Sequence, residues 1–227
     1  MGTWRNTIKT QARGRSLYAG APTRENFGWR QKSRDDRGVK LFDHNGMTVL
    51  RVESPQEMLA YRPSFVGAYQ TIFAQAPYFE RFFPNDAEAV LQRGLETPSQ
   101  ITLLVTRGAT QVVGFAMGVP LSYRRDVARE MGGLLPEAHT FYLSELGVLP
   151  RYRHSGLGAM LIRERLKLID PKVFSHVVLR TSASPEVSQT LYLDAGFEDI
   201  GVYQEVSSRR IDGSVRSDLR LFFSKTL

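Results

Sequence analysis

A basic turn that precedes an apolar helix is the segment of this sequence best suited to bind a phosphate group. It carries Arg151, Arg153 and His154, which supply positive charge and hydrogen-bond donors. Gly156 and Gly158 follow where the helix is expected to begin, and a ligand can approach the backbone closely at a residue without a Cβ. The first N–H groups of a helix have no partner inside it, and the helix dipole makes that end positive. These residue types in this order therefore favour a phosphate or pyrophosphate ligand.

Two common nucleotide-binding motifs do not fit this turn. No Gly-Lys-Ser/Thr follows the glycines as in a P-loop, and the third glycine and downstream acidic residue of a dinucleotide fingerprint are missing. The pattern that fits is R-x-x-G-x-G, with Arg153, Gly156 and Gly158 in register. A second motif, L-Y-L-D-A-G-F, begins at Leu191, about 35 residues after the first glycine. Taken alone, the glycines have a simpler explanation, which is that they relieve crowding between a helix and a strand. The presence of both motifs at this distance indicates a ligand site instead.

With both motifs in order, the sequence resembles the GNAT superfamily of acyl-CoA-dependent N-acyltransferases over residues 47–226. In that family this turn wraps the pyrophosphate of coenzyme A. The resemblance implies the GNAT fold, an α/β (α+β) arrangement. Its central sheet is mixed and mostly antiparallel, is flanked by helices, and contains parallel central strands that splay apart. The resemblance also implies direct acetyl transfer from acetyl-CoA to a primary amine through a ternary complex, without a metal.

The resemblance assigns cofactor contacts to specific residues. The backbone of residues 146–148 would pair with the pantetheine arm like an added strand, and an N–H there would face the oxyanion. Seven residues before Tyr192 the family often has Asn, whereas this chain has Pro185, so Ser184 is the expected substitute. The expected cofactor-binding residues are Leu146, Gly147, Val148, Arg151, Arg153, His154, Ser155, Gly156, Leu157, Gly158, Ala159 and Ser184.

Two side chains are candidates for proton transfer. Glu145 lies three residues before Val148, where many family members carry a carboxylate that deprotonates the amine, often through water. Alternatively, Glu145 only orients the acceptor or pairs with an arginine such as Arg151. Tyr192 matches the tyrosine of the second motif, which in the family donates a proton to the departing thiolate. Its alternative is a packed aromatic residue whose hydroxyl has a local partner.

Aromatic residues gather well before both motifs. Tyr61, Phe65, Tyr69 and Phe73 recur at steps of four, the spacing of a helix face that packs on a sheet. The aromatic cluster within residues 78–83 is expected to line the acceptor pocket instead. This would make the acceptor or the acyl chain partly apolar.

The hydrophobic pattern predicts the elements that must position these residues. Ser54 is followed by Pro55 and Glu57, which together favour a helix start. Further helices are expected over 86–95, 156–169 and 184–196, strands over 47–52, 101–107, 111–121, 140–149, 176–181, 199–208 and 215–223, and a loop or irregular helix over 122–138.

Composition excludes several classes of protein. The chain has 227 residues, 42% of them hydrophobic, which is enough for a sizeable core. No apolar run approaches the roughly 20 residues of a membrane helix, so no membrane contact is expected. The absence of cysteine excludes disulfides and thiolate chemistry, and the four histidines lack H-x-x-x-H spacing, so no metal site is expected. A cytoplasmic location is the default expectation.

The positive charge is confined to the N-terminus. Residues 1–40 hold ten Lys/Arg and three Asp/Glu, a net charge of +7, which equals that of the whole chain, so residues 41–227 are neutral. We divide the chain into a basic arm, residues 1–45, and a GNAT domain, residues 46–227. The arm could bind nucleic acid or another polyanion, act as an organellar import signal, or lie against the domain.

Two functions from different classes remain open. The first is an N-acetyltransferase that uses acetyl-CoA, or a longer acyl-CoA, and a small-molecule or peptide amine as acceptor. The second is a catalytically silent GNAT fold that serves in binding or assembly and is anchored to a polyanion by the arm. Glu145 and Tyr192 favour the first function, and the segregated charge favours the second. Association into a homodimer is left open.

Overall fold

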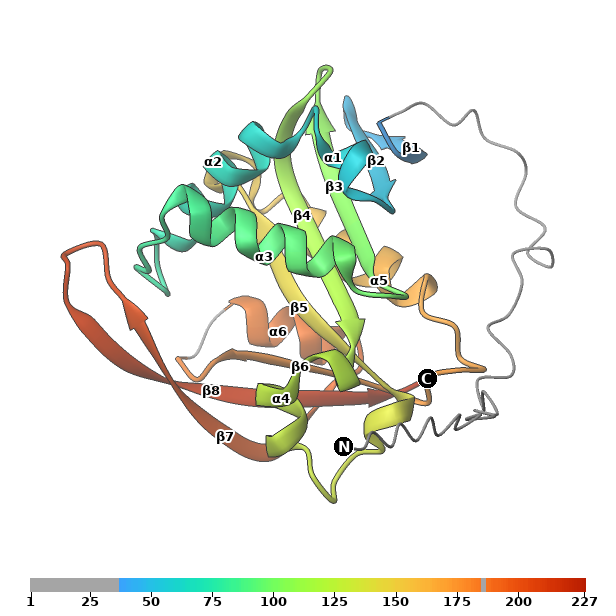
Figure 1. Cartoon of the computed structure of the whole chain (residues 1–227), viewed down its shortest axis with the longest axis vertical. Helices are drawn as coiled ribbons and strands as arrows, with labels where there is room; N and C mark the ends of the chain where they lie inside the picture. The colour runs from blue at the N-terminus through green and yellow to red at the C-terminus, as the bar shows by residue number, and fades with distance from the viewer. Residues whose placement is uncertain (1–36, 185–186) are drawn as a thin grey trace, which may run out of the picture. The chain divides into compact units, whose positions relative to one another are not determined.

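The computed structural model describes residues 37–184 and 187–227. Within these ranges no helix is long and apolar enough to cross a membrane. The elements, labelled in Figure 1, are β1 (Val39–His44), β2 (Met47–Val52), α1 (Pro55–Met58), α2 (Arg62–Phe73), α3 (Pro84–Glu96), β3 (Ile101–Arg107), β4 (Gln111–Pro120), α4 (Arg125–Glu130), β5 (Thr140–Val148), α5 (Leu157–Lys167), β6 (His176–Ser182), α6 (Val187–Asp194), β7 (Glu198–Arg209) and β8 (Val215–Thr226).

The strands of the described chain form one sheet in the order β1-β2-β3-β4-β5-β6-β8-β7. Neighbouring strands are antiparallel except for β5 and β6, which are parallel. These two strands pair only from Thr140 to Leu143 against His176 to Leu179, and β5 then continues to Val148 paired with β4 alone. The structure therefore confirms the expected mixed sheet with central parallel strands that separate.

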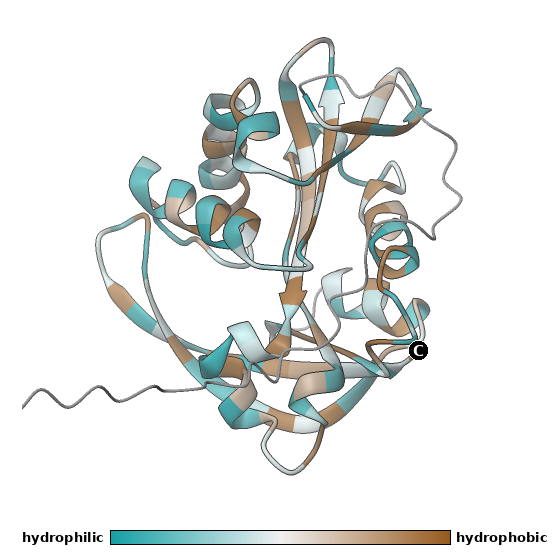
Figure 2. Cartoon of the chain, turned by 45° about the vertical axis from the view of Figure 1, so that its right-hand side comes forward, coloured by the Kyte–Doolittle hydropathy of each residue, from teal (hydrophilic) through white to brown (hydrophobic). Residues whose placement is uncertain are grey.

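Helices cover both faces of the sheet, as the view in Figure 2 shows. Neighbouring residues of one strand point to opposite faces, so Leu103 belongs to the core under α5 and Leu104 to the core under α2 and α3. Both faces are therefore apolar along β3 and β4, which explains why these strands read as continuous hydrophobic runs. The expected helix after Ser54 is two helices, because Pro63 lies in the first turn of α2, where its missing N–H is tolerated.

The sheet begins earlier than the sequence indicated. Residues 39–44, assigned to the basic arm, form β1, which pairs with β2 from Val39↔Arg51 to His44↔Met47. Asn45 and Gly46 make the turn with φ values of 50° and 72°, the left-handed conformation that a two-residue hairpin requires. The expected boundary at residue 45 therefore falls inside this hairpin. Residues 1–36 of the arm lie outside the described residues.

The hairpin formed by β7 and β8 reaches the segment that follows α2. The Arg81 N–H donates to the Arg209 carbonyl at 2.8 Å, and the Ile211 N–H donates to the Phe79 carbonyl at 3.0 Å. Glu80 forms a bridge with Arg210 between these two bonds. We call this contact between residues 78–81 and 209–211 the hairpin junction. It joins the last hairpin to the helical layer on one face of the sheet.

Candidate active site

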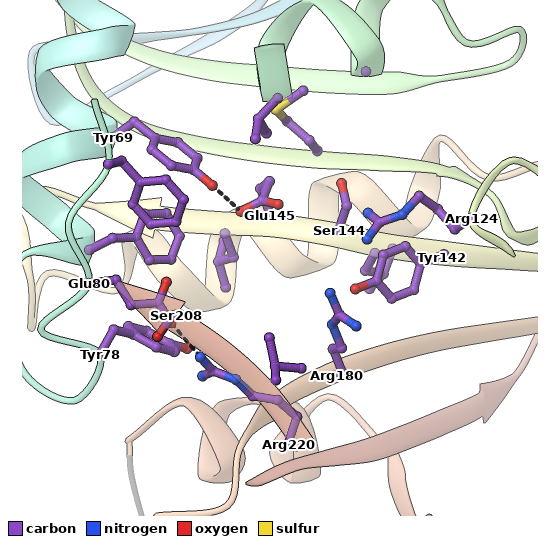
Figure 3. A pocket seen from close by; sticks show the side chains of 18 of the residues that line it. Tyr69, Tyr78, Glu80, Arg124, Tyr142, Ser144, Glu145, Arg180, Ser208 and Arg220 are labelled. Carbon is purple, nitrogen blue, oxygen red and sulfur yellow. Dashed lines mark hydrogen bonds and ion pairs between the residues drawn. The ribbon is translucent and has the colours of Figure 1, made fainter. Parts of the chain in front are cut away.

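A pocket of about 580 Å³ lies beside β5 where β6 diverges from it. Its lining comes from α2, α3, β5, β6, α6 and the β7–β8 hairpin, and Figure 3 shows its labelled side chains. Glu145 and Tyr192, the two residues expected to transfer protons, both line this pocket. The fold therefore brings together two residues that are 47 positions apart in the sequence.

The carboxyl group of Glu145 is enclosed by the pocket. Its Oε2 atom accepts a hydrogen bond from the Tyr69 hydroxyl at 3.3 Å. Burial raises the pKa of Glu145 to about 7, and the Arg124 cation is the largest of the effects that oppose this rise. Arg151, named above as an alternative partner, instead lies over the ring of Tyr152 at 4.9 Å. A carboxyl group with a pKa near neutrality is well suited to act as a general base.

Tyr192 is 7% exposed and packs edge-on against Phe197, with ring centroids 5.7 Å apart. Burial raises the pKa of its hydroxyl, although the nearby Arg165 cation lowers it. The tyrosine therefore remains protonated near neutral pH. Tyr192 thus packs in the core and also lines the pocket, so both interpretations given above for this residue fit its position.

Arg165 on α5 is a buried cation that the motifs did not reveal. Its Nη1 atom donates to the carbonyls of Met117 at 2.7 Å and Glu145 at 2.9 Å. Its Nε and Nη2 atoms are buried without a partner among the described residues. The arginine thus holds β4 and β5 together where their register shifts and where Glu145 enters the pocket. A charged residue four positions after Leu161, on the apolar face of a helix, was the available sign in the sequence.

The C-terminal half of β5 presents a backbone edge beyond its pairing with β6. Leu146, Gly147 and Val148 pair with β4 on one side, and in the described chain no strand pairs with their other side. Arg153 Nε occupies one acceptor by donating to the Val148 carbonyl at 3.1 Å. Unpaired backbone groups at such an edge can bind an extended ligand as an added strand.

Gly156 introduces α5 with a left-handed backbone, φ 80°, and a Cβ there would meet no atom within 4 Å. No side chain caps this helix end in the described structure. His154 is exposed with φ 58°, and the Ser155 hydroxyl donates to the Tyr152 carbonyl at 2.6 Å. The first N–H groups of α5 are therefore available to an anion.

The other residues of the expected cofactor site have different surroundings. Leu157 is buried in the core, Gly158 packs under Leu191, and Ala159 is exposed. Ser184 is exposed, and its carbonyl accepts from Gln189 Nε2 at 3.0 Å. Pro185 lies outside the described residues.

The aromatic residues divide between core and pocket. All four residues of the stripe from Tyr61 to Phe73 are buried, and Tyr69 and Phe73 also line the pocket. Within the 78–83 cluster, Tyr78 and Phe82 line the pocket, whereas Phe79 and Phe83 are exposed and do not. Two further lining residues, Arg124 beside α4 and Arg180 on β6, come from segments that no motif marked.

Comparisons with known proteins agree on one family. The sequence model described as "Acetyltransferase (GNAT) family" matches residues 64–197, and no curated protein matches the chain. The ribosomal-protein-alanine N-acetyltransferase from Brucella melitensis is 18% identical, with a TM-score of 0.56 over 78% of this chain and 99% of that chain.

Two other solved structures share the fold at similar identity. The ribosomal-protein-S18-alanine N-acetyltransferase from Escherichia coli is 16% identical, with a TM-score of 0.55 over 79% of this chain and 93% of that chain. Arabidopsis thaliana NAA60, in complex with a bisubstrate analogue, is 16% identical, with a TM-score of 0.52 over 79% of this chain and 99% of that chain. At these identities the likeness shows the fold alone.

Proposed function

The chain belongs to the acetyltransferase (GNAT) family, and on this premise we propose that it is an N-acetyltransferase that transfers an acetyl group from acetyl-CoA directly to a primary amine. The observation that carries the proposal is the position of Glu145, a carboxyl group with a pKa of about 7 in the pocket that also holds Tyr192. Neither feature would be needed by a silent binding fold, and the comparisons give that alternative no support.

The described residues fit the parts of an acyl-CoA thioester. The unpaired edge of residues 146–148 offers hydrogen bonds to an extended amide chain, and the uncapped start of α5 offers N–H groups to a pyrophosphate. Arg153 adds positive charge beside that turn. When bound, acetyl-CoA would supply the activated acetyl group. A backbone N–H of residues 146–148 would stabilise the negative charge that develops on the thioester oxygen.

Proton transfer is assigned to the two pocket residues. The Glu145 carboxylate takes a proton from the attacking amine, directly or through water, as the new carbon–nitrogen bond forms. The Tyr192 hydroxyl gives a proton to the leaving sulfur as the carbon–sulfur bond breaks. Arg165 acts as a positioning residue, because it holds the Glu145 carbonyl and its charge stabilises the Tyr192 phenolate left after proton donation.

Calorimetry with acetyl-CoA, followed by a screen of amine acceptors that measures thiol release, tests the proposal. Tyr192→Phe should lower kcat by roughly 100-fold or more, the usual range for losing one proton-transfer group, and leave acetyl-CoA affinity nearly unchanged. The Phe variant keeps the packing against Phe197 and so controls for folding. Absence of acetyl-CoA binding to the wild-type protein would overturn the assignment.

A further inference from the structure

The charged groups of the pocket indicate which kind of amine it accepts. We propose that the acceptor is a small amine with an anionic group of its own, a carboxylate or a phosphate, and that Arg124 and Arg180 bind this anionic group. The inference rests on the proposed acetyltransferase function and specifies its acceptor.

Arg124 and Arg180 share a single carboxylate. The Nε and Nη2 atoms of Arg124 donate to Oδ1 and Oδ2 of Asp126, both at 3.1 Å. The Nη1 atom of Arg180 lies 3.3 Å from the same Oδ2 atom. The other partner of Arg180 is the neutral amide oxygen of Gln204. In the described chain no second carboxylate is ion-paired with either arginine. The two cations therefore share one ion-paired carboxylate, and the Glu145 carboxyl, which both of them influence, is the other acid close to them.

The two arginines are more buried than the carboxylate that they share. Both arginine side chains are 20% exposed, whereas Asp126 is 48% exposed and so is better screened by solvent. The Arg124 guanidinium also lies over the Tyr142 ring at 4.9 Å, which holds the group in place. Asp126 takes the Nε–Nη2 side of this guanidinium, so a ligand carboxylate or phosphate would meet its Nη1–Nη2 side.

A second arginine cluster, which meets the pocket through Glu80 and Arg220, is electrically balanced. Arg220 pairs with Glu80, and Arg210 pairs with Asp218, so two cations face two anions. These pairs support the hairpin junction and have no charge left for a ligand. Arg81, Arg93 and Arg209 also line the pocket but are exposed, so the partly buried cations that share a carboxylate are those at the Arg124 end.

Glu145 lies next to that end. Figure 3 shows Arg124 and Arg180 converging beside Tyr142 and Ser144, with Glu145 the next residue along β5. Both arginines act on the Glu145 carboxyl electrostatically and oppose the rise of its pKa. An acceptor whose nitrogen approaches Glu145 can therefore place an anionic group, a few bonds away, on the two guanidinium groups. Amino acids and aminoalkyl phosphates have this arrangement.

The volume of the pocket favours a small acceptor over a protein segment. Its roughly 580 Å³ is within the range of pockets for small molecules. The hairpin junction connects two of its walls through main-chain hydrogen bonds, so these walls do not separate freely. A long peptide would have to cross this contact.

Matched acceptor pairs test the proposal on the full-length protein. The rate of thiol release from acetyl-CoA is measured with amino acids and their carboxamides, and with phosphoethanolamine and ethanolamine, so that the two pairs distinguish carboxylate from phosphate. We expect the anionic member of one pair to have a kcat/KM at least about 10-fold higher. Arg124→Gln and Arg180→Gln should each lower the ratio of kcat/KM for the anionic member to kcat/KM for the neutral member by roughly 10- to 100-fold. This ratio cancels the effect that either arginine has on the pKa of Glu145.

Arg125→Gln, at an exposed position of α4 adjacent to Arg124, is the matched control and should retain the wild-type preference. Arg180→Lys should retain part of it. Equal rates with charged and neutral amines, or a preference for peptides, would overturn the inference while the acetyltransferase function stands.

Calorimetry separates failure of the inference from failure of the function. Acetyl-CoA affinity is measured first, and its absence would refute the proposed function. The N-acetylated acid and its amide are then titrated without turnover. Tighter binding of the acid that is lost in Arg180→Gln supports the anion site, and equal binding of the two contradicts it.

Discussion

A carboxyl group enclosed between Tyr69 and the pocket walls is difficult to ionise, because burial disfavours the charged form. Arg124 and Arg180 partly compensate by favouring the anion, and Glu80 opposes them. The outcome is a glutamate that changes charge near pH 7 rather than near its ordinary value of 4.5. At the scale of single residues, this one group links the rate of the reaction to the stability of the protein.

The rate should depend on pH through Glu145. Because only the carboxylate can accept a proton, kcat/KM calculated for the neutral form of the amine should rise with pH up to about 7 and then level off. Glu145→Gln should lower kcat/KM by roughly 100-fold at pH 8 and remove this limb. A pH–rate profile for both proteins measures this. A limb near pH 7 that persists in the Gln variant would exclude Glu145 as the base.

Stability should depend on the same group with the opposite sign. A pKa of about 7 in the folded state, against 4.5 when unfolded, means that the protonated group stabilises the fold fully below pH 4.5 and that this contribution is lost as pH rises through 7. Glu145→Gln should therefore be more stable than wild type at pH 8, by at most roughly 3 kcal/mol, and similar at pH 4.5. Urea unfolding at the two pH values measures the difference, and a gap that does not widen with pH would refute the argument.

The residues of the site differ in how far the sequence could reveal them. Glu145 and Tyr192 lie at fixed positions in motifs, so the resemblance identified them. Arg124 and Arg180 have no motif, and their importance comes from sharing Asp126, a contact between segments more than 50 positions apart. Only the folded chain shows that two cations there face one carboxylate.

At the scale of elements, the turn into α5 has one conformational requirement. Gly156 has φ 80°, which residues with a Cβ adopt at an energetic cost, and the space around it is open. The glycine therefore serves the helix end and the proposed ligand, since no packing contact requires it. Gly108, in the β3–β4 turn, has φ 61° and equally open surroundings, so it provides a matched comparison.

Gly156→Glu should abolish acetyl-CoA binding, because the side chain blocks the start of α5 and its charge repels the pyrophosphate. Gly108→Glu carries a similar backbone strain, of about 1–2 kcal/mol, and should bind normally. Calorimetry on the two variants, with thermal unfolding to confirm that both fold, compares them directly. Equal binding by both would show that the turn is not the phosphate site.

The periodic elements were predictable, and the departures have local causes. The β3–β4 hairpin was expected because two apolar runs flank a glycine-containing turn, and the structure confirms it. The sequence did not indicate β1, because its residues continue a polar, glycine-containing segment and were assigned with it to the basic arm, residues 1–45. The separation of α1 from α2 depends on Pro63, whose effect on a helix varies with its position.

At the scale of the whole molecule, the basic segment and the described domain can be tested separately. The net charge of +7 lies in residues 1–40, and the sheet begins at Val39. Deletion of residues 1–36 should leave a folded domain that binds acetyl-CoA with unchanged affinity. If the full-length protein binds a nucleic acid, its affinity should fall steeply as the salt concentration rises. Deletion of the segment should weaken that affinity by more than about 10-fold. Loss of cofactor binding in the shortened protein would show that the segment is part of the site.

The position of β8 between β6 and β7 has a consequence for synthesis of the protein. In the described sheet β7 pairs with β8 alone, and β6 gains its antiparallel neighbour only from β8. A nascent chain can therefore complete the sheet only after β8, which ends at Thr226, has left the ribosome. Messages truncated before that codon would yield chains with an open sheet edge, which are targets for proteolysis rather than partially active enzymes.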